Sequence, residues 1–370
     1  MKKGAVWLAT AAVAASLLVA GCGDDEEESS GGGGTTAEEG GGEVGKVAVL
    51  LPDSKSSVRW ETVDRPSLQA AFDAAGVEVE IQNAEGDKST QQQQAEQAIT
   101  NGAKVLLLVN LDSGSGAAIA ANAKSQGVKV IDYDRLTLDT DATDYYVSFN
   151  NEKVGQLQGQ GIVDCLGDKQ GAEIAVLNGS PTDNNATLFK QGYDSVINPK
   201  FDSGEWKEVD DQAVPDWDNQ KALTIFEQIL QKNGNKIDGV VAANDGLGNA
   251  AISALKQRKL PQVPVTGQDA TLQGIQNIVN GDQCMTVYKA VKKEADAAAE
   301  LAIALAKGEE PTAETTPVNN GTKDVPSILL DPVAVTEDNI SEYTGEPDFP
   351  KVEEICAGDL AAKCKEIGLE

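Results

Sequence analysis

Polar side chains of three kinds follow the apolar segments of this sequence, at the point where each segment ends. Aspartates only accept hydrogen bonds, arginines and lysines only donate them, and asparagines do both. Such a mixture can saturate the hydroxyl groups of a neutral polyol with charge-assisted hydrogen bonds, whereas a phosphate site is biased toward donors and a cation site toward acceptors. The candidate residues are Arg59, Asp134, Arg135, Asp183, Asn185, Asn244, Asp269 and Lys289.

Two tryptophans, Trp60 and Trp217, lie in polar stretches where a core aromatic is unexpected. The face of a tryptophan is a natural platform for the apolar C–H face of a sugar ring. Taken alone, each candidate has a simpler interpretation: a single Asp or Asn after a strand commonly caps a helix or forms a turn, and either tryptophan could pack in a core. The prediction of a sugar site therefore depends on their joint placement.

Other chemistries find little support in the composition. The 59 acidic residues against 30 basic ones give a net charge of −29, which argues against a nucleic-acid partner. The absence of histidine excludes His-based triads and His metal ligands, and we expect no metal and no cofactor.

Two weaker motifs point to other functions. Residues 246–251 fit a dinucleotide-binding pattern, but Asp245 would place a carboxylate beside the pyrophosphate. Two carboxylates of the candidate site could serve a glycosidase, yet nothing assigns one as acid and the other as nucleophile. We therefore expect a binding protein and not an enzyme.

Apolar segments alternate with amphipathic ones from Lys46 onward, and the pattern restarts near residue 150. Continuous apolar strands between helices predict parallel sheets covered on both faces, here in two similar doubly wound α/β lobes. Ligands of such sheets bind outside the carboxyl ends of the strands. The predicted strands are 46–51, 77–81, 104–109, 128–133, 172–177, 237–243, 263–267 and 284–289. The predicted helices are 64–75, 116–126, 151–165, 186–197, 218–233, 248–258, 271–280 and 291–307. A further predicted helix is capped by Ser89 or Thr90 and ends at Asn101, and residues 308–346 are predicted to be extended.

The first 45 residues are predicted to lie outside the fold. Residues 1–21 combine a basic start, an apolar stretch too short to span a membrane and small residues before Cys22, which is typical of a lipoprotein leader. The mature chain would then begin at a lipid-bearing Cys22, exported and anchored; an ordinary secretory signal is the alternative. Residues 22–45 hold eight acidic residues, no basic ones and many glycines, which predicts a flexible tether.

Four cysteines remain after Cys22, and an even number in an oxidising compartment predicts two disulfides. Cys356 and Cys364 enclose a short C-terminal segment, so we pair them, which leaves Cys165 with Cys284.

Several motifs make the chain resemble the periplasmic sugar-binding proteins of ABC importers, and within them those that bind D-xylose. The motifs fall between residues 46 and 342: Arg59-Trp60, Tyr133-Asp134-Arg135, 148–155, Gly179-Ser180-Pro181, 183–186, Asn244-Asp245, 267–270, 285–289 and 319–327. The resemblance implies that the eight polar candidates hydrogen-bond a pyranose and that Trp60 and Trp217 sandwich it. One departure is Ala213, where the family usually has a further tryptophan.

The resemblance also implies the periplasmic binding protein type I fold, in which two lobes joined by three crossovers close on a monosaccharide. The crossovers are expected near 148–150, 286–290 and 327–332. The expected division of the chain is a leader (1–21), a tether (22–45), an N-terminal lobe (46–148 plus 290–328), a C-terminal lobe (149–289 plus 329–346) and a disulfide-bearing tail (347–370).

The expected function is that of an extracytoplasmic lipoprotein, a monomer, that delivers D-xylose or a related aldose to the permease of an ABC importer. A sensory receptor that feeds a membrane kinase or chemoreceptor is the alternative, because the same closed form can signal. An exported sugar-active enzyme is third. The sequence does not fix the aldose, because one exocyclic group is worth only about 1–3 kcal/mol of discrimination.

Overall fold

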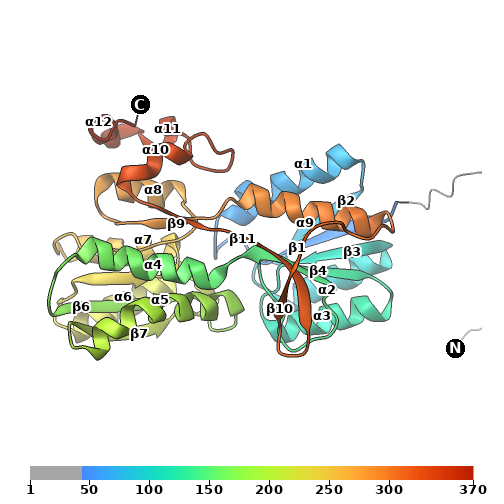
Figure 1. Cartoon of the computed structure of the whole chain (residues 1–370), viewed down its shortest axis with the longest axis horizontal. Helices are drawn as coiled ribbons and strands as arrows, with labels where there is room; N and C mark the ends of the chain where they lie inside the picture. Colours follow the sequence, from blue (N-terminus) through green and yellow to red (C-terminus); the bar gives the residue numbers. More distant parts are fainter. Residues whose placement is uncertain (1–43, 370) are drawn as a thin grey trace, which may run out of the picture. The chain divides into compact units, whose positions relative to one another are not determined.

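The computed structural model describes residues 44–369. Its larger sheet has seven strands in the order β10-β11-β5-β4-β3-β1-β2, all parallel except for the antiparallel pair β10–β11. The strands are β1 (Lys46–Leu51), β2 (Val79–Asn83), β3 (Ala103–Leu108), β4 (Lys129–Tyr133), β5 (Tyr145–Phe149), β10 (Thr316–Asn319) and β11 (Asp324–Leu330). This sheet and its helices form the N-terminal lobe (Figure 1).

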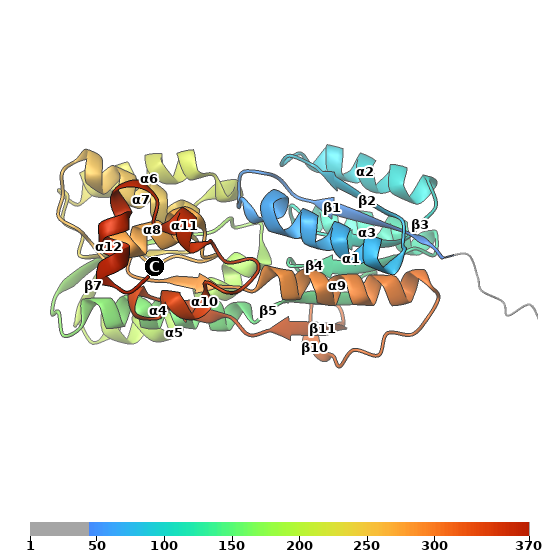
Figure 2. The same cartoon turned by 90° about the horizontal axis from the view of Figure 1, so that it is seen from above.

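Two pairs of helices cover the two faces of this sheet. Helices α1 (Arg65–Ala75) and α9 (Val291–Ala306) pack on one face through Leu68, Phe72 and a row of alanines. Helices α2 (Lys88–Thr100) and α3 (Ser113–Ser125) pack on the other. α1 and α9 therefore lie side by side although about 220 residues separate them, and both views show this (Figures 1 and 2).

The C-terminal lobe contains a smaller parallel sheet in the order β7-β6-β8, with a separate antiparallel pair β12–β9. Its strands are β6 (Ala172–Asn178), β7 (Trp206–Ala213), β8 (Gly239–Ala242), β9 (Thr286–Tyr288) and β12 (Val333–Val335). Its helices are α4 (Asn151–Leu166), α5 (Asn184–Asp202), α6 (Asn219–Lys232), α7 (Asp245–Gln257) and α8 (Leu272–Asn280). Short η segments are η1 (Trp60–Asp64), η2 (Pro215–Trp217), η3 (Glu337–Asn339) and η4 (Gly358–Leu360).

The chain passes between the two lobes three times. It leaves β5 for α4 at residues 149–151, β9 for α9 at 288–291, and β11 for β12 at 330–333. Within the C-terminal lobe, α4 and α5 cross at glycines, because a Cβ on Gly155 would lie 2.0 Å from the carbonyl oxygen of Phe189. A larger residue at Gly155 would force the two helices apart.

The end of the chain, for which the sequence analysis names a disulfide-bearing tail without elements, is folded into short helices. Helices α10 (Ile340–Tyr343), α11 (Val352–Ile355) and α12 (Ala361–Glu366) follow β12 and lie beside α8 (Figure 2). Phe349, Ile355 and Leu369 are buried in one cluster with Ile275 of α8 and Tyr288 of β9. Apolar residues spaced too irregularly for a helical pattern thus form a small cap on the C-terminal lobe.

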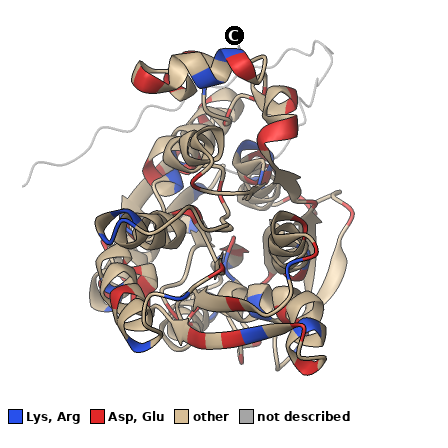
Figure 3. Cartoon of the chain, turned by 90° about the vertical axis from the view of Figure 1, so that its left-hand side faces the viewer, with Lys and Arg blue, Asp and Glu red and all other residues tan. Residues whose placement is uncertain are grey.

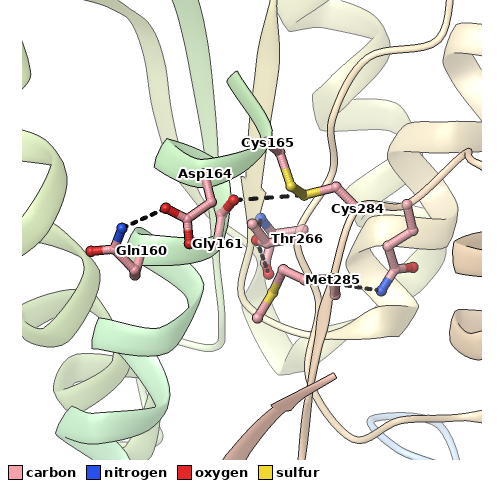
Figure 4. The surroundings of a disulfide bond; sticks show 9 residues. Gln160, Gly161, Asp164, Cys165, Thr266, Cys284 and Met285 are labelled. Carbon is pink, nitrogen blue, oxygen red and sulfur yellow. Dashed lines mark hydrogen bonds between the residues drawn. A yellow bond between two sulfur atoms is a disulfide. The ribbon is translucent and has the colours of Figure 1, made fainter. Parts of the chain in front are cut away.

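Two disulfides are present among the described residues, Cys165–Cys284 and Cys356–Cys364. The first joins the end of α4 to the segment before β9 (Figure 4). The second joins α12 to the residue after α11, within the cap. Cys22, the predicted site of lipidation, lies outside the described residues, as do the leader and all but the end of the tether.

Residues 340–343, predicted to be extended, form α10, and the predicted elements differ from the structure in other places as well. β5 and β7 were not expected: β5 is short and follows a turn-rich stretch, and β7 is a polar edge strand with exposed residues. The predicted strand 263–267 makes a single bridge, between Val265 and Val240. The side chain that caps α2 is that of Asp87, which accepts from the backbone N–H of Thr90, and neither Ser89 nor Thr90 is the cap.

Acidic and basic residues are interspersed along the helices and strands of the described chain (Figure 3). Many form exposed ion pairs such as Lys124–Asp141 (2.8 Å), and pairs of this kind contribute little to stability. None of the helices in residues 44–369 is long and apolar enough to cross a membrane. In the same residues no three His, Cys, Asp or Glu side chains lie close enough together to hold a metal ion.

Candidate functional site

One cavity brings together all ten residues that the sequence analysis proposes for a sugar site. They come from both lobes and from the crossover between β9 and α9, and they are Arg59, Trp60, Asp134, Arg135, Asp183, Asn185, Trp217, Asn244, Asp269 and Lys289. Four further residues line the cavity and were missed: Ser56, Ser57, Phe189 and Gln268. The first two are generic loop residues, and Phe189 and Gln268 carry no pattern that separates them from core or turn residues.

The carboxyl ends of the strands deliver most of these side chains. In the N-terminal lobe, Arg59 and Trp60 follow β1, and Asp134 and Arg135 follow β4 directly. In the C-terminal lobe, Asp183 follows β6 and caps α5, because its carboxylate accepts from the backbone N–H of Asn185. Parallel strands gather such loops at one edge of a sheet, so distant parts of the sequence meet there.

Asn244 is both a helix cap, which is the simpler interpretation of an Asn after a strand, and a residue of the cavity lining. It follows β8 and caps α7, accepting from the backbone N–H of Leu247 at 2.9 Å. Its Nδ2 donates to the carbonyl of Ser56, 3.3 Å away in the other lobe. The helix cap fixes the side chain where it lines the cavity.

Three cavity residues have left-handed backbones that non-glycine residues rarely adopt. The φ angles are 63° for Asp134, 54° for Trp217 and 92° for Asp269. Such strain persists only where surrounding contacts hold it, and it is concentrated at functional sites. All three of these residues line the cavity.

Arg59 lies at the centre of a buried charge cluster. Its Nε and Nη2 donate to Asp64 (2.9 and 2.7 Å), Nη2 also to Glu294 (2.6 Å) and Nη1 to Asp134 (2.8 Å). Its Cζ lies 4.5 Å from the centroid of the Trp60 ring. Burial opposes ionisation of Asp134, but the positive charges of Arg59, Lys289 and Arg135 lower its pKa. Asp134 therefore faces the cavity as an anion.

A second ion pair joins the lobes at the Trp217 side of the cavity. Nε of Arg135 lies 3.0 Å from Oδ2 of Asp183, and Nε1 of Trp217 donates to the same oxygen at 3.1 Å. A Cβ on Gly179 would lie 2.0 Å from Cη2 of Trp217, so the ring packs directly on the glycine backbone. Trp217 is thus fixed by a hydrogen bond along its edge and by a glycine beside its ring.

Asp134 is the acceptor that most directly connects the lobes. Asn185 donates from Nδ2 to the carbonyl of Asp134 (3.0 Å) and to its carboxylate (3.1 Å). Lys289 lies 3.9 Å from the same carboxylate and 3.3 Å from that of Asp269. One lysine on a crossover therefore lies between a carboxylate of each lobe.

Two buried aspartates outside the cavity hold its loops. Asp132 of β4 accepts from the backbone and hydroxyl of Thr137 and from Thr143, which fixes the loop that carries Asp134. Asp245 of α7 accepts from Thr271, Gln283 and Thr286, which fixes the loop that carries Asp269. Burial raises the pKa of Asp132 to about 7 and that of Asp245 to about 6.

Comparison with known proteins identifies the family to which this fold belongs. Residues 47–310 match the family model described as a periplasmic binding protein domain. The chain belongs to the periplasmic binding protein family. It has the type I form of that fold, with two lobes of parallel sheet and helices, and the family is one of binding proteins and not of enzymes.

Similar members of the family are named for the sugar they bind or have been solved in complex with a sugar. The D-xylose-binding periplasmic protein of Escherichia coli (strain K12) is 42% identical over 84% of this chain and 92% of its own. That of Haemophilus influenzae is 43% identical over 80% of this chain and 88% of its own. The carbohydrate transporter solute-binding protein of Chloroflexus aurantiacus, solved with D-glucose, is 33% identical, with a TM-score of 0.76 over 82% of this periplasmic binding protein and 98% of that chain.

Proposed function

We propose that this periplasmic binding protein captures D-xylose between its lobes and delivers it to the permease of an ABC importer. The observation that carries the proposal is the convergence of ten predicted ligand residues on one cavity lined by both lobes. Anionic acceptors, cationic donors and amides all face that cavity, which suits hydroxyl groups that donate and accept. The names of the two xylose-binding relatives favour a pentose.

In this proposal the sugar is the contact that closes the lobes. Arg59, Asp134 and Arg135 would bind it from one lobe, and Asp183, Asn185, Asn244 and Asp269 from the other, with Lys289 at the crossover. Trp60 and Trp217 would pack on the sugar ring. The sugar would make all of these contacts only when the lobes meet. It would therefore bind the closed form more tightly than the open form and shift the population toward the closed form.

The proposal includes a lipid anchor at Cys22 and action as a monomer at the outer face of the cytoplasmic membrane. Cys22→Ser is expected to move the protein from the membrane fraction to the soluble fraction, and mass spectrometry of the wild type is expected to show acyl chains. A wild-type protein without lipid would remove the anchor from the proposal and leave sugar binding unaffected.

Intrinsic fluorescence of the full chain tests the ligand. Trp206 lies outside the cavity. In the variant Trp206→Phe, the tryptophans that remain among the described residues are Trp60 and Trp217, and both line the cavity. We expect a saturable response to D-xylose at low micromolar concentration or below and weaker responses to L-arabinose, D-glucose and D-ribose. A stronger response to D-glucose would change the ligand to a hexose, and no response to any of the four would contradict the proposal.

A sensory role uses the same closed form and is the second candidate. The two roles differ in the partner of the sugar-bound protein. Stimulation of the ATPase of a reconstituted permease by protein plus D-xylose supports transport, and absence of stimulation alongside activation of a sensor kinase supports sensing.

A further inference from the structure

Glu294 is a buried carboxylate that the sequence analysis does not include in the site. It lies in the first turn of α9, five residues after Lys289, on the segment that follows the crossover from β9. An acidic residue in a first helical turn is normally explained by the helix dipole and exposed to solvent. Here the side chain is fully buried, so its position needs another explanation.

The explanation begins with its hydrogen bond to Arg59. A guanidinium has five N–H donors in a fixed plane. Four are used by protein carboxylates: two by Asp64, one by Asp134 and one by Glu294. The fifth, on Nη1, remains for a ligand in the cavity that Arg59 lines. Asp64 and Glu294 together fix the plane of the guanidinium and hence the direction of that free N–H.

Burial disfavours the ionised form of Glu294, and the nearby carboxylates of Asp134 and Asp64 add to this effect, whereas Arg59 and Lys289 oppose it. The groups that face it are Arg59 and Asp64 from the segment before α1, Tyr133 and Asp134 from β4 and its loop, Tyr146 from β5, and Lys289 from the crossover. Its Oε1 is buried with no hydrogen-bond partner among the described residues, and an unpartnered anionic oxygen costs more than a neutral one. Burial raises the pKa of Glu294 to about 8, although Arg59 opposes the shift.

We propose that Glu294, in its protonated form, is a positioning residue that orients the guanidinium of Arg59 toward the sugar. Sugar binding would therefore take up a proton in mildly alkaline solution. The inference rests on the proposed function. Glu294 does not line the cavity, but its neighbours Arg59, Asp134 and Lys289 do. An open, sugar-free form would admit water beside these three residues, which would reduce the burial of the carboxylate and lower its pKa relative to the closed form. Between these two pKa values, closure on the sugar must protonate Glu294, and affinity falls by up to about tenfold per pH unit.

Titration calorimetry of the full chain with D-xylose tests this from pH 6.5 to 9.5. Repeating each titration in two buffers with different heats of ionisation gives the number of protons taken up. For the wild type we expect uptake that rises toward one proton above neutral pH, with a parallel loss of affinity. Glu294→Ala removes one of the two acceptors of Arg59 Nη2, and we expect at least about tenfold weaker binding at pH 6.5, or roughly 1.4 kcal/mol.

Glu294→Gln separates positioning from protonation. It keeps an acceptor for Arg59 but has no proton to lose, so we expect it to rescue most of the loss in Glu294→Ala and to abolish both proton uptake and pH dependence. Lys289, Tyr133 and Tyr146 are unchanged in this variant, so a pH dependence that persists belongs to them and overturns the proposal. Glu300→Gln, an exposed site on the same helix, is the control and should behave as the wild type.

The wild-type profile alone can also overturn the proposal, which keeps the test valid if Glu294→Ala does not fold. Sugar binding without proton uptake and with constant affinity would contradict the role of Glu294 and leave the proposed function standing. No binding of any tested sugar would contradict the proposed function itself.

Discussion

Arg135 and Asp183 meet across the two lobes, with Nε and Oδ2 3.0 Å apart and both side chains more than nine-tenths buried. The arginine follows β4 of the N-terminal lobe, and the aspartate caps α5 of the C-terminal lobe. The indole N–H of Trp217 donates a hydrogen bond to the same oxygen of Asp183. The ion pair and Trp217 therefore form one wall of the cavity, and that wall is complete only when the lobes are together.

Asp183→Ala is therefore expected to weaken D-xylose binding by more than about tenfold, because it leaves Arg135 buried without its counter-ion and Trp217 without its acceptor. Calorimetry of Arg135→Ala, Asp183→Ala and the double variant should show that the double variant loses less than the sum of the single losses. Strict additivity would show that the two residues act independently. Lys221→Ala, which removes an exposed ion pair with Asp216, is the matched control.

Gly179→Ala is expected to impair sugar binding more than folding. The added Cβ would lie 2.0–2.6 Å from three ring atoms of Trp217, so the ring must leave its place at the cavity. We expect at least about tenfold weaker D-xylose binding. Gly345→Ala, where a Cβ meets open space, should bind as the wild type does. Unchanged affinity in Gly179→Ala would show that Trp217 has no fixed role.

The thermal midpoint of the sugar-free protein is expected to fall as the pH rises from 5 to 7. Asp132 and Asp245 have folded-state pKa values of about 7 and about 6, above the roughly 3.9 of an unfolded chain. Each raised pKa gives stability that is complete below pH 4 and is lost as the pH rises through the folded value, by at most about 1.4 kcal/mol per pH unit and group.

Asp132→Asn and Asp245→Asn should each flatten this dependence, because an amide does not titrate. The control is Asp338→Asn, an exposed residue, which should keep the wild-type slope. A wild-type midpoint that is constant or rises between pH 5 and 7 would show that neither aspartate is protonated in the fold.

The two disulfides should differ in their contribution to stability. The Cys165–Cys284 bond closes a loop of 119 residues and the Cys356–Cys364 bond one of 8. In the chain-entropy account the longer loop gives about 5 kcal/mol and the shorter about 2.5 kcal/mol. Urea unfolding of the paired Cys→Ser variants should rank them in that order, and the reverse ranking would show that the chain-entropy account fails here.

Much of the site could be predicted because strand ends are visible in the sequence. The apolar segments 46–51 and 128–133 are clear, and the residues that follow them, including Arg59 and Asp134, must lie at one edge of the sheet. The same logic places Asp183 and Asn244, whose helix caps also orient them.

What could not be predicted depends on contacts between distant segments. Glu294 sits beside Lys292 and Lys293 in an ordinary amphipathic helix, and only packing of α9 against the Arg59 segment shows that it is buried. β7 is a polar edge strand whose pattern lacks an apolar face. The cap formed by Phe349, Ile355 and Leu369 is likewise a tertiary cluster without a local period.

Calorimetric titration with D-xylose of the wild type, Trp217→Ala and Trp206→Phe tests the central claim most directly. The account predicts one sugar per chain, binding more than about tenfold weaker in Trp217→Ala, and an unchanged affinity in Trp206→Phe, whose tryptophan lies outside the cavity. Equal affinity in Trp217→Ala and the wild type, with both variants folded, would contradict the claim that sugar binds in the cavity between the lobes.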